Sequence, residues 1–127
     1  MVVDRETVSG WLDRYVAAWT SYDREAIGDL FDEDAVYAYG PYGEPVRGRD
    51  AIVESWLTDQ DDPGTYDGHY EPIAVDGDVA VANGRSRYVE ADGATLTSEY
   101  DNIFVLRFGG DGRCVEFREW YMERPKD

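Results

Sequence analysis

Apolar residues in the first half of the chain recur at the three- and four-residue spacing of amphipathic helices. The stretch from Val8 to Tyr22 puts its apolar side chains on one helix face, and Asp4 stands where an N-cap is expected. Asp23 precedes a second, short helix in the same way, and a third helix is predicted over Asp50–Leu57. The pattern therefore predicts three helices, each with one apolar face to bury.

From residue 66 onward the pattern changes to the alternation of apolar and polar residues that is typical of strands. Three Asp-Gly pairs interrupt it, and Asp-Gly is the strongest short-range signal for a β-hairpin. Earlier in the chain, one strand is predicted over Ala35–Tyr39 and a short one near Val46. The later strands are predicted over 66–75, 79–90, 96–108 and 114–123. Consecutive hairpins of this kind form an antiparallel meander.

This order of elements predicts an α+β fold, because the sheet is the only surface against which the helices can bury their apolar faces. We expect the three helices of the N-terminal half to pack on a strongly curved antiparallel sheet. The result would be a cone-shaped, cystatin-like α+β barrel with a pocket at its open end. No linker, repeat or low-complexity tract divides the sequence, so a single domain is expected over residues 1–127.

The charge composition narrows the partners that such a domain can have. The chain has 28 acidic and 12 basic residues and a formal net charge of −16, which repels nucleic-acid phosphates and anionic lipid surfaces. A single cysteine, Cys114, excludes an intrachain disulfide. No apolar run approaches the roughly 20 residues of a membrane span. We therefore expect a cytoplasmic protein without nucleic-acid or membrane partners.

Several short motifs occur in an order that resembles a known superfamily. They are Tyr15-Val-Ala-Ala-Trp19, Asp34-Ala-Val36, Gly43-Glu-Pro-Val-Arg-Gly-Arg-Asp-Ala-Ile52, Asp76-Gly-Asp-Val-Ala80 and Arg107-Phe-Gly-Gly-Asp-Gly-Arg113. Together they resemble the nuclear transport factor 2-like superfamily and, within it, the SnoaL-like group. The resemblance covers nearly the whole chain and implies the same helices-then-meander cone. The superfamily includes isomerases, dehydratases, cyclases, epoxide hydrolases, carrier proteins and binding modules, so the fold alone does not give the function.

The start of the chain is similar to the ketosteroid isomerases of this superfamily, and Tyr15 falls on their oxyanion-hole tyrosine. Their two catalytic aspartates, however, fall on Tyr39 and Phe104. A phenol with an ordinary pKa of about 10 is a poor base at neutral pH, and phenylalanine has no proton to donate. We therefore do not expect ketosteroid-type isomerisation, and other groups have to carry any chemistry.

His69 is the first candidate for acid–base catalysis. It is the only histidine of the chain, and the ordinary pKa of histidine suits proton transfer near pH 7. The resemblance to scytalone dehydratase-like relatives, which use a histidine on the strand after the third helix, implies the same role for His69. The alternative is a surface or strand-end histidine that is hydrogen-bonded to the backbone.

Glu119 is the second candidate. By alternation it shares a strand face with Phe117 and Tyr121. The resemblance turns this face toward the cavity, where burial would raise the pKa of the carboxyl and suit it to acid or base catalysis. The alternative is an ion pair with an arginine, such as Arg85, Arg87 or Arg118.

Ligand-binding candidates follow from the same resemblance, which places the shared face of Tyr100, Asn102 and Phe104 inside the cavity. A buried Asn102 needs hydrogen-bond partners, either a ligand or water or a neighbour such as Tyr15 or Glu119. Five aromatic residues are also expected to form walls of the pocket: Tyr15, Trp19, Tyr39, Trp56 and Tyr121. For Trp19, Tyr39 and Trp56 the alternative is plain packing in the core. No metal-ligand spacing or phosphate-binding loop occurs, so neither a metal nor another cofactor is expected.

Three functions remain open at this point. The first is an acid–base enzyme, an isomerase, dehydratase or cyclase, that acts on a small and largely apolar molecule. The second is a small-molecule binding domain without catalysis. The third is a protein-interaction domain that uses an apolar patch on the outer face of the sheet. Many relatives pair through that face, so the resemblance also implies a homodimer.

Overall fold

The computed structural model describes residues 2–125, so residues 1, 126 and 127 of the predicted domain lie outside the described part of the chain. In that part the helices are α1 (Arg5–Ser21), α2 (Arg24–Asp29) and α3 (Arg49–Thr58). The strands are β1 (Phe31–Ala38), β2 (Val46–Arg47), β3 (Tyr66–Asp76), β4 (Val79–Val89), β5 (Leu96–Phe108) and β6 (Cys114–Glu123). No helix between residues 2 and 125 combines the length and the apolar character needed to cross a membrane.

Helix α1 begins and ends at residues with the expected capping geometry. The side chain of Asp4 accepts a hydrogen bond of 2.7 Å from the backbone N–H of Thr7, which confirms the predicted N-cap. At the other end, Tyr22 adopts a left-handed conformation with φ 52° and its N–H bonds the carbonyl of Ala18. One face of the helix is buried: Val8, Trp11, Leu12, Tyr15 and Ala18.

The meander forms as predicted. Strands β3, β4, β5 and β6 pair consecutively and antiparallel. In the three Asp-Gly turns the glycines have positive φ angles, 61° at Gly77, 74° at Gly93 and 83° at Gly112. Side chains other than glycine rarely adopt such angles, so the Asp-Gly pairs fix the turns and with them the register of the hairpins.

The sheet as a whole is mixed, which corrects the prediction of a purely antiparallel sheet. Its strand order is β2-β1-β6-β5-β4-β3, and β1 runs parallel to β6. Strand β1 also begins earlier than predicted, at Phe31 instead of Ala35, and the carbonyl of Leu30 accepts a bond from the N–H of Cys114 on β6. Hydrophobic periodicity reports which residues are buried but not which strand is the partner, so this pairing was not predicted.

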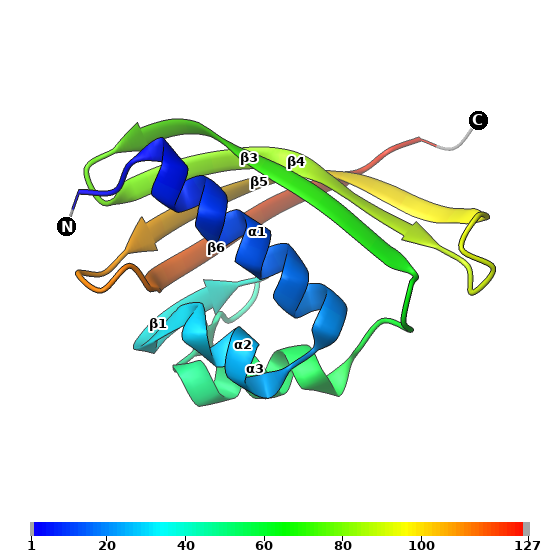
Figure 1. Ribbon diagram of the computed structural model, residues 1–127, viewed down its shortest axis with the longest axis horizontal. Coiled ribbons are helices and arrows are strands. Elements are labelled where there is room, and N and C mark those ends of the chain that lie inside the picture. Colours follow the sequence, from blue (N-terminus) through cyan, green and yellow to red (C-terminus); the bar gives the residue numbers. More distant parts are fainter. Residues whose placement is uncertain (1, 126–127) are drawn as a thin grey trace.

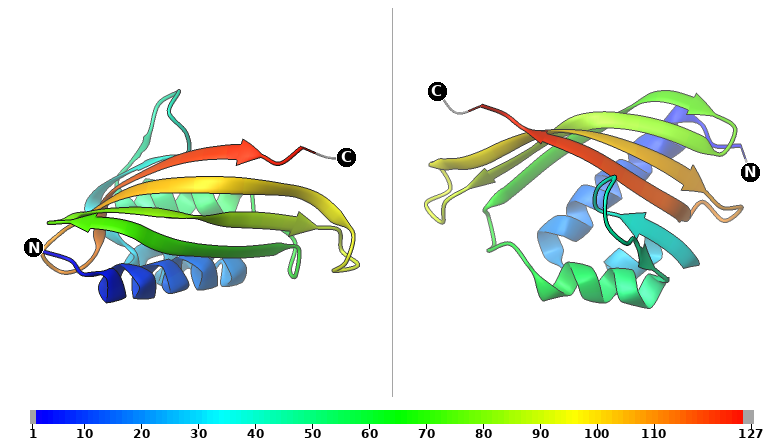
Figure 2. Two further views of the ribbon diagram at one scale, coloured as in Figure 1. Left: turned by 90° about the horizontal axis from the view of Figure 1, so that it is seen from above. Right: turned by 180° about the vertical axis from the view of Figure 1, so that it is seen from behind.

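All three helices cover the same, concave face of the curled sheet (Figures 1 and 2). Helix α1 lies along β3, and its Trp11 and Tyr15 pack against the aromatic rings of β5 and β6, while α2 and α3 lie beside β1. The described sheet does not close into a barrel, because β2 and β3 remain as its two edges. The far halves of β4 and β5 and the hairpin between them extend beyond the helices (Figure 1). The α+β cone is therefore packed at one end and open at the other.

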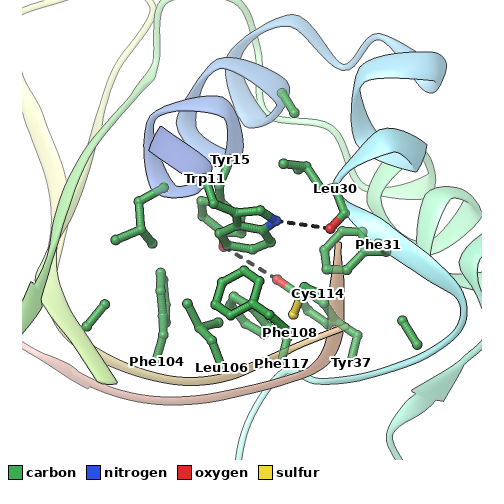
Figure 3. Close-up of a cluster of buried hydrophobic side chains, with 14 of the residues drawn as sticks. Trp11, Tyr15, Leu30, Phe31, Tyr37, Phe104, Leu106, Phe108, Cys114 and Phe117 are labelled. Atoms are coloured by element: carbon green, nitrogen blue, oxygen red, sulfur yellow. Dashed lines mark hydrogen bonds between the residues drawn. The ribbon is translucent and has the colours of Figure 1, made fainter. Parts of the chain in front are cut away.

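Aromatic side chains fill the packed end (Figure 3). The indole of Trp11 makes T-shaped contacts with Phe31 and Phe108, and its Nε1 donates a 3.0 Å hydrogen bond to the carbonyl of Leu30. Each of these large side chains is almost fully buried, and burying one stabilises the fold by about 1.5–3 kcal/mol. Cys114 is buried beside them, as expected for a small core residue.

Candidate functional site

The inner face of the sheet changes from apolar to polar along its strands. On β5 the residues of the inner face, taken from Leu106 backwards along the strand, are first the buried Leu106 and Phe104. Asn102, Tyr100 and Ser98 come next on the same face. On β4 the small apolar residues at 80 and 82 give way to Ser86 and Tyr88. This polar half of the inner face lies toward the part of the sheet that the helices leave uncovered (Figure 1).

A cavity of about 400 Å³ opens there, which is within the usual size range of small-molecule sites. Its aromatic lining consists of Tyr15, Trp19, Tyr37, Tyr39, Tyr66, Tyr70, Tyr88, Tyr100 and Tyr121. The other lining residues are Ser86, Ser98, Asn102 and Glu119. Tyr39 and Tyr121 are the most exposed of the aromatic group, at 40% and 58%, and they mark the mouth of the cavity.

Glu119 supplies the carboxyl group of this cavity. Its Oε2 accepts a 2.7 Å hydrogen bond from Nδ2 of Asn102, and its Oε1 forms no hydrogen bond to any described residue. Burial raises the pKa of Glu119 from 4.5 to about 7, against the bond from Asn102, which lowers the pKa. A carboxyl with this pKa is partly protonated at neutral pH, so it can accept or donate a proton there.

A chain of hydrogen bonds runs from the edge of the sheet to Glu119. Ser86 Oγ donates to Oδ1 of Asn102 at 3.0 Å, and Ser86 is itself bonded to the hydroxyl of Tyr70. The hydroxyls of Tyr70 and Tyr66 are 2.9 Å apart. Because the single proton of Ser86 is used on Asn102, Tyr70 must donate to Ser86, and Tyr66 in turn to Tyr70. All donors therefore point toward Glu119 and hold its Oε2 in place.

Two glycines make room for this chain. A Cβ atom on Gly84 would lie 2.0 Å from the carbonyl oxygen of His69 and 2.6 Å from Cα of Tyr70. A Cβ atom on Gly68 would lie 2.1 Å from the hydroxyl oxygen of Tyr66. Side chains at these positions would push Tyr66 and Tyr70 away from each other and from Ser86.

Several predicted residues line the cavity as expected: Glu119, Tyr15, Trp19, Tyr39, Tyr100, Asn102 and Tyr121. Tyr15 is buried beneath the cavity, and its hydroxyl lies 3.4 Å from that of Tyr37 (Figure 3). Burial raises the pKa of both phenols well above 10, so they remain neutral hydrogen-bond donors. Asn102 finds its partners in Glu119 and Ser86, which answers the question of how its buried amide is satisfied.

Two predicted wall residues belong to the core instead. Trp56 and Phe104 are each only 1% exposed and are not part of the lining. The ring of Trp56 stacks on that of Trp19 with 4.3 Å between the ring centres, and the rings of Phe104 and Tyr70 pack with their centres 4.6 Å apart. They lie behind the residues that face the cavity, so a direct ligand contact is not expected of them.

The structure does not bring His69 together with Glu119. In the β3–β4 register Tyr70 opposes Gly84 on the inner face, so its neighbour His69, opposite Arg85, points outward. The side chain of His69 is 78% exposed, and its Nε2 lies 2.9 Å from Oε1 of Glu71. It is therefore a surface histidine, bonded to a carboxylate, and it lies outside the cavity lining.

The predicted alternative for Glu119, an ion pair with an arginine, does not occur among the described residues. Arg85 and Arg87 approach Glu99 on the outer face of the sheet, at 3.7 and 4.0 Å. The guanidinium of Arg118 lies over the ring of Trp120. No cluster of three or more His, Cys, Asp or Glu side chains suited to a metal ion occurs between residues 2 and 125.

Sequence reasoning missed Tyr37, Tyr66, Tyr70, Ser86, Tyr88 and Ser98 as lining residues. The signal for some of them was available, because Tyr66, Gly68 and Tyr70 fall on one face of β3 by alternation. On β5 and β6 the resemblance supplies the direction of the face, and Asn102 and Glu119 lie in the lining.

Comparison with known proteins gives the family. No curated protein matches the sequence, but the profile of the SnoaL-like domain family matches residues 12–117. The matched stretch runs from α1 into β6 and includes the whole cavity lining except Glu119 and Tyr121. It covers most of the chain, and the observed α+β fold agrees with it. The chain therefore belongs to the SnoaL-like domain family, a part of the nuclear transport factor 2-like superfamily.

Proposed function

We propose that this chain is a cofactor-independent acid–base enzyme that moves a proton on a small, largely apolar molecule, with Glu119 as the catalytic acid and base. The reaction class is isomerisation, dehydration or cyclisation. The observation that carries the proposal is the environment of Glu119: a carboxyl group of pKa about 7 faces an aromatic cavity with one oxygen free. Perturbed carboxyl groups of this kind concentrate at active sites.

The proposed first step is removal of a proton from a carbon next to a carbonyl group. Oε1 of Glu119 takes the proton, and the electron pair of the broken C–H bond forms an enolate. The phenols of Tyr15 and Tyr88 stay neutral, since burial raises the pKa of each, and they donate hydrogen bonds to the enolate oxygen. Protonated Glu119 then returns the proton to another carbon, which completes an isomerisation, or to a leaving hydroxyl, which completes a dehydration.

The residues proposed for this step differ from those of the ketosteroid isomerases. The two positions that resemble their aspartates are Tyr39, at the mouth of the cavity, and Phe104, in the core. The proposed base comes from β6 instead, and Asn102 on the neighbouring strand positions it.

Exchange of α-protons for deuterium tests the elementary step directly. Aryl-fused cyclic ketones such as 2-tetralone are incubated with the protein in D₂O, and deuterium incorporation is followed by proton NMR. We expect the protein-dependent rate to rise with pH to a plateau, with a midpoint near 7, because the ionised carboxylate is the base. Glu119→Gln should lower the rate at least about 100-fold, the usual lower value for general-base catalysis.

The matched control for this experiment is Glu44→Gln, which makes the same chemical change at an exposed loop position outside the cavity. Its exchange rate should equal that of the unaltered protein. If a ketone binds in the cavity but Glu119→Gln exchanges its protons as fast as the unaltered protein, Glu119 is not the base.

Ligand binding without catalysis is the second candidate function. It is favoured by the hydrogen bonds that the polar groups of Tyr66, Tyr70, Ser86 and Asn102 already make with one another. A site of this kind would bind the ketones, with a higher melting temperature of the complex, and show no exchange above the background rate.

The outer face of the sheet supports the proposal of a homodimer. Ile103 and Trp120 oppose each other in the β5–β6 register and are 37% and 38% exposed, next to Met122 at 75%. A second copy of the chain would cover these apolar side chains. Light scattering at micromolar concentration should give the mass of two chains, and Trp120→Glu should shift it to that of one. A single-chain mass for the unaltered protein would contradict the homodimer.

A further inference from the structure

The walls of the cavity around Glu119 are built mainly from tyrosine. Among the described residues, eight of the ten tyrosines of the chain line it, together with Trp19. The two others are elsewhere: Tyr22 is bonded to Asp61, and Tyr42 is 92% exposed on a loop. The described lining contains no Lys, Arg or His. The carboxyl of Glu119 therefore faces the cavity without a positive partner among residues 2–125.

Four of these tyrosines form an arc across the four strands of the meander. The ring centres of Tyr66 on β3 and Tyr88 on β4 are 5.5 Å apart. Those of Tyr88 and Tyr100 on β5 are 6.0 Å apart, and those of Tyr100 and Tyr121 on β6 are 5.6 Å apart. The last two pairs are nearly perpendicular, at 84° and 85°. In a perpendicular contact the ring that contributes its edge keeps both faces free of that partner. Ring faces are thus available along the arc.

The negative charge of Glu119 acts on the phenols that line the cavity. Burial is the main cause of the raised pKa of these five phenols, and the charge of Glu119 raises each pKa further: Tyr15, Tyr37, Tyr39, Tyr70 and Tyr88. The carboxyl of Glu119 shares the cavity lining with all five of these residues. Together with Asn102 it forms the polar centre of an aromatic enclosure.

Such an enclosure discriminates ligands by charge. The face of an aromatic ring carries negative electrostatic potential and attracts a cation within about 6 Å of its centre. A carboxylate adds attraction, and the net charge of −16 raises the local concentration of cations around the whole molecule. An anionic ligand would meet repulsion from Glu119 and no basic side chain among the described lining residues.

We infer that the cavity takes an organic cation, with an alkylated ammonium group held between the tyrosine arc of β3 to β6 and the carboxylate of Glu119. This inference rests on the proposed function in using the same cavity and the same carboxyl, and it adds the charge class of the ligand. The two are chemically compatible, because a positive nitrogen near a carbonyl group makes the adjacent C–H bonds more acidic and so easier for a carboxylate to break.

Two ligands of the same shape test the inference. 3-Hydroxyphenyltrimethylammonium and 3-tert-butylphenol differ only in a charged nitrogen in place of a carbon, and calorimetry gives the affinity of each. We expect the cation to bind at least about tenfold more tightly, and 3-hydroxybenzoate, an anion, to bind most weakly. In 1 M salt the screening length falls to about 3 Å, so attraction by the overall charge is removed and the preference should remain.

Substitutions locate the preference within the cavity. Tyr88→Leu, Tyr100→Leu and Glu119→Gln should each weaken binding of the cation by about fivefold or more while changing the affinity of the neutral isostere much less. Tyr42→Leu is the matched control, because this exposed tyrosine lies outside the lining, and it should change neither affinity. Circular dichroism of each variant confirms that it is folded.

The inference is overturned if the neutral isostere or the anion binds as tightly as the cation, if none of the three binds, or if the preference is lost in 1 M salt. The exchange experiment with neutral ketones is independent of this result. Exchange without a preference for the cation would overturn the inference and leave the proposed function standing. A preference for the cation, together with ketones that bind but do not exchange their protons, would support a cation-binding site and overturn the proposed catalysis.

Discussion

Replacing Gly84 with alanine is expected to destabilise the fold by about 4 kcal/mol or more, a loss seen only for severe substitutions. The added Cβ would lie 2.0 Å from the carbonyl oxygen of His69 and 2.6 Å from Cα of Tyr70. Both atoms belong to the backbone of β3, so no side-chain rotation can relieve the overlap. The strands would have to separate where Tyr70, Gly84 and Asn102 lie side by side.

Chemical denaturation of the variant and of the unaltered protein measures this loss. The matched control is Gly10→Ala in helix α1, where nothing lies within 4 Å of the added atom. Alanine in an exposed helix position is more favourable than glycine by about 1 kcal/mol, so this variant should be slightly more stable. A Gly84→Ala protein within 1 kcal/mol of the unaltered one would show that β3 and β4 are not packed as described.

The second large effect is expected from Glu119→Gln, which should stabilise the protein at pH 8. Below pH 4.5 the carboxyl holds its proton in the folded and the unfolded chain, so it has no influence on stability. Between pH 4.5 and about 7 the unfolded chain loses the proton while the folded chain keeps it, so stability falls as the pH rises. Above pH 7 the folded state carries a full penalty, about 2 to 3 kcal/mol after allowance for partial solvent access.

Glutamine removes this penalty because it is neutral at every pH and its side-chain oxygen can still accept the bond from Asn102. The free energy of unfolding, measured for both proteins between pH 4 and pH 8, should therefore diverge only above about pH 5. Glu44→Gln serves again as the control and should follow the unaltered protein throughout. Parallel stability curves for Glu119→Gln and the unaltered protein would mean that the carboxyl is not desolvated in the folded state.

Most of the fold follows from local patterns in the sequence. The spacing of apolar residues predicts all three helices, and Asp4 gives the start of the first, since one buried face is enough to specify a helix. The Asp-Gly pairs fix the hairpins of the meander because their glycines occupy positive φ angles. The parallel pairing of β1 with β6 has no local signature. It depends on packing between segments about 80 residues apart, which periodicity does not report.

The candidate site could be predicted in part for the same reason. Alternation along β5 and β6 shows which residues share a face with Asn102 and Glu119. The resemblance implies that this face is the inner one, and it adds Tyr15. The same rule along β3 puts His69 on the face opposite to Tyr70, so its isolation from the cavity could have been predicted once Tyr70 was recognised as an inner residue. Alternation groups Tyr66, Gly68 and Tyr70 on one face of β3, but which of the two faces is the inner one depends on the packing of the sheet against the helices, which alternation does not report.

The central claim is that the carboxyl of Glu119 is held in an aromatic cavity in a state that can exchange a proton near neutral pH. Carbon-13 NMR of protein labelled at the glutamate side-chain carboxyls measures its titration directly, and Glu119→Gln assigns the resonance. The account predicts a pKa of about 7 for this carboxyl. A pKa between 4 and 5, the ordinary range of an exposed glutamate, would contradict it.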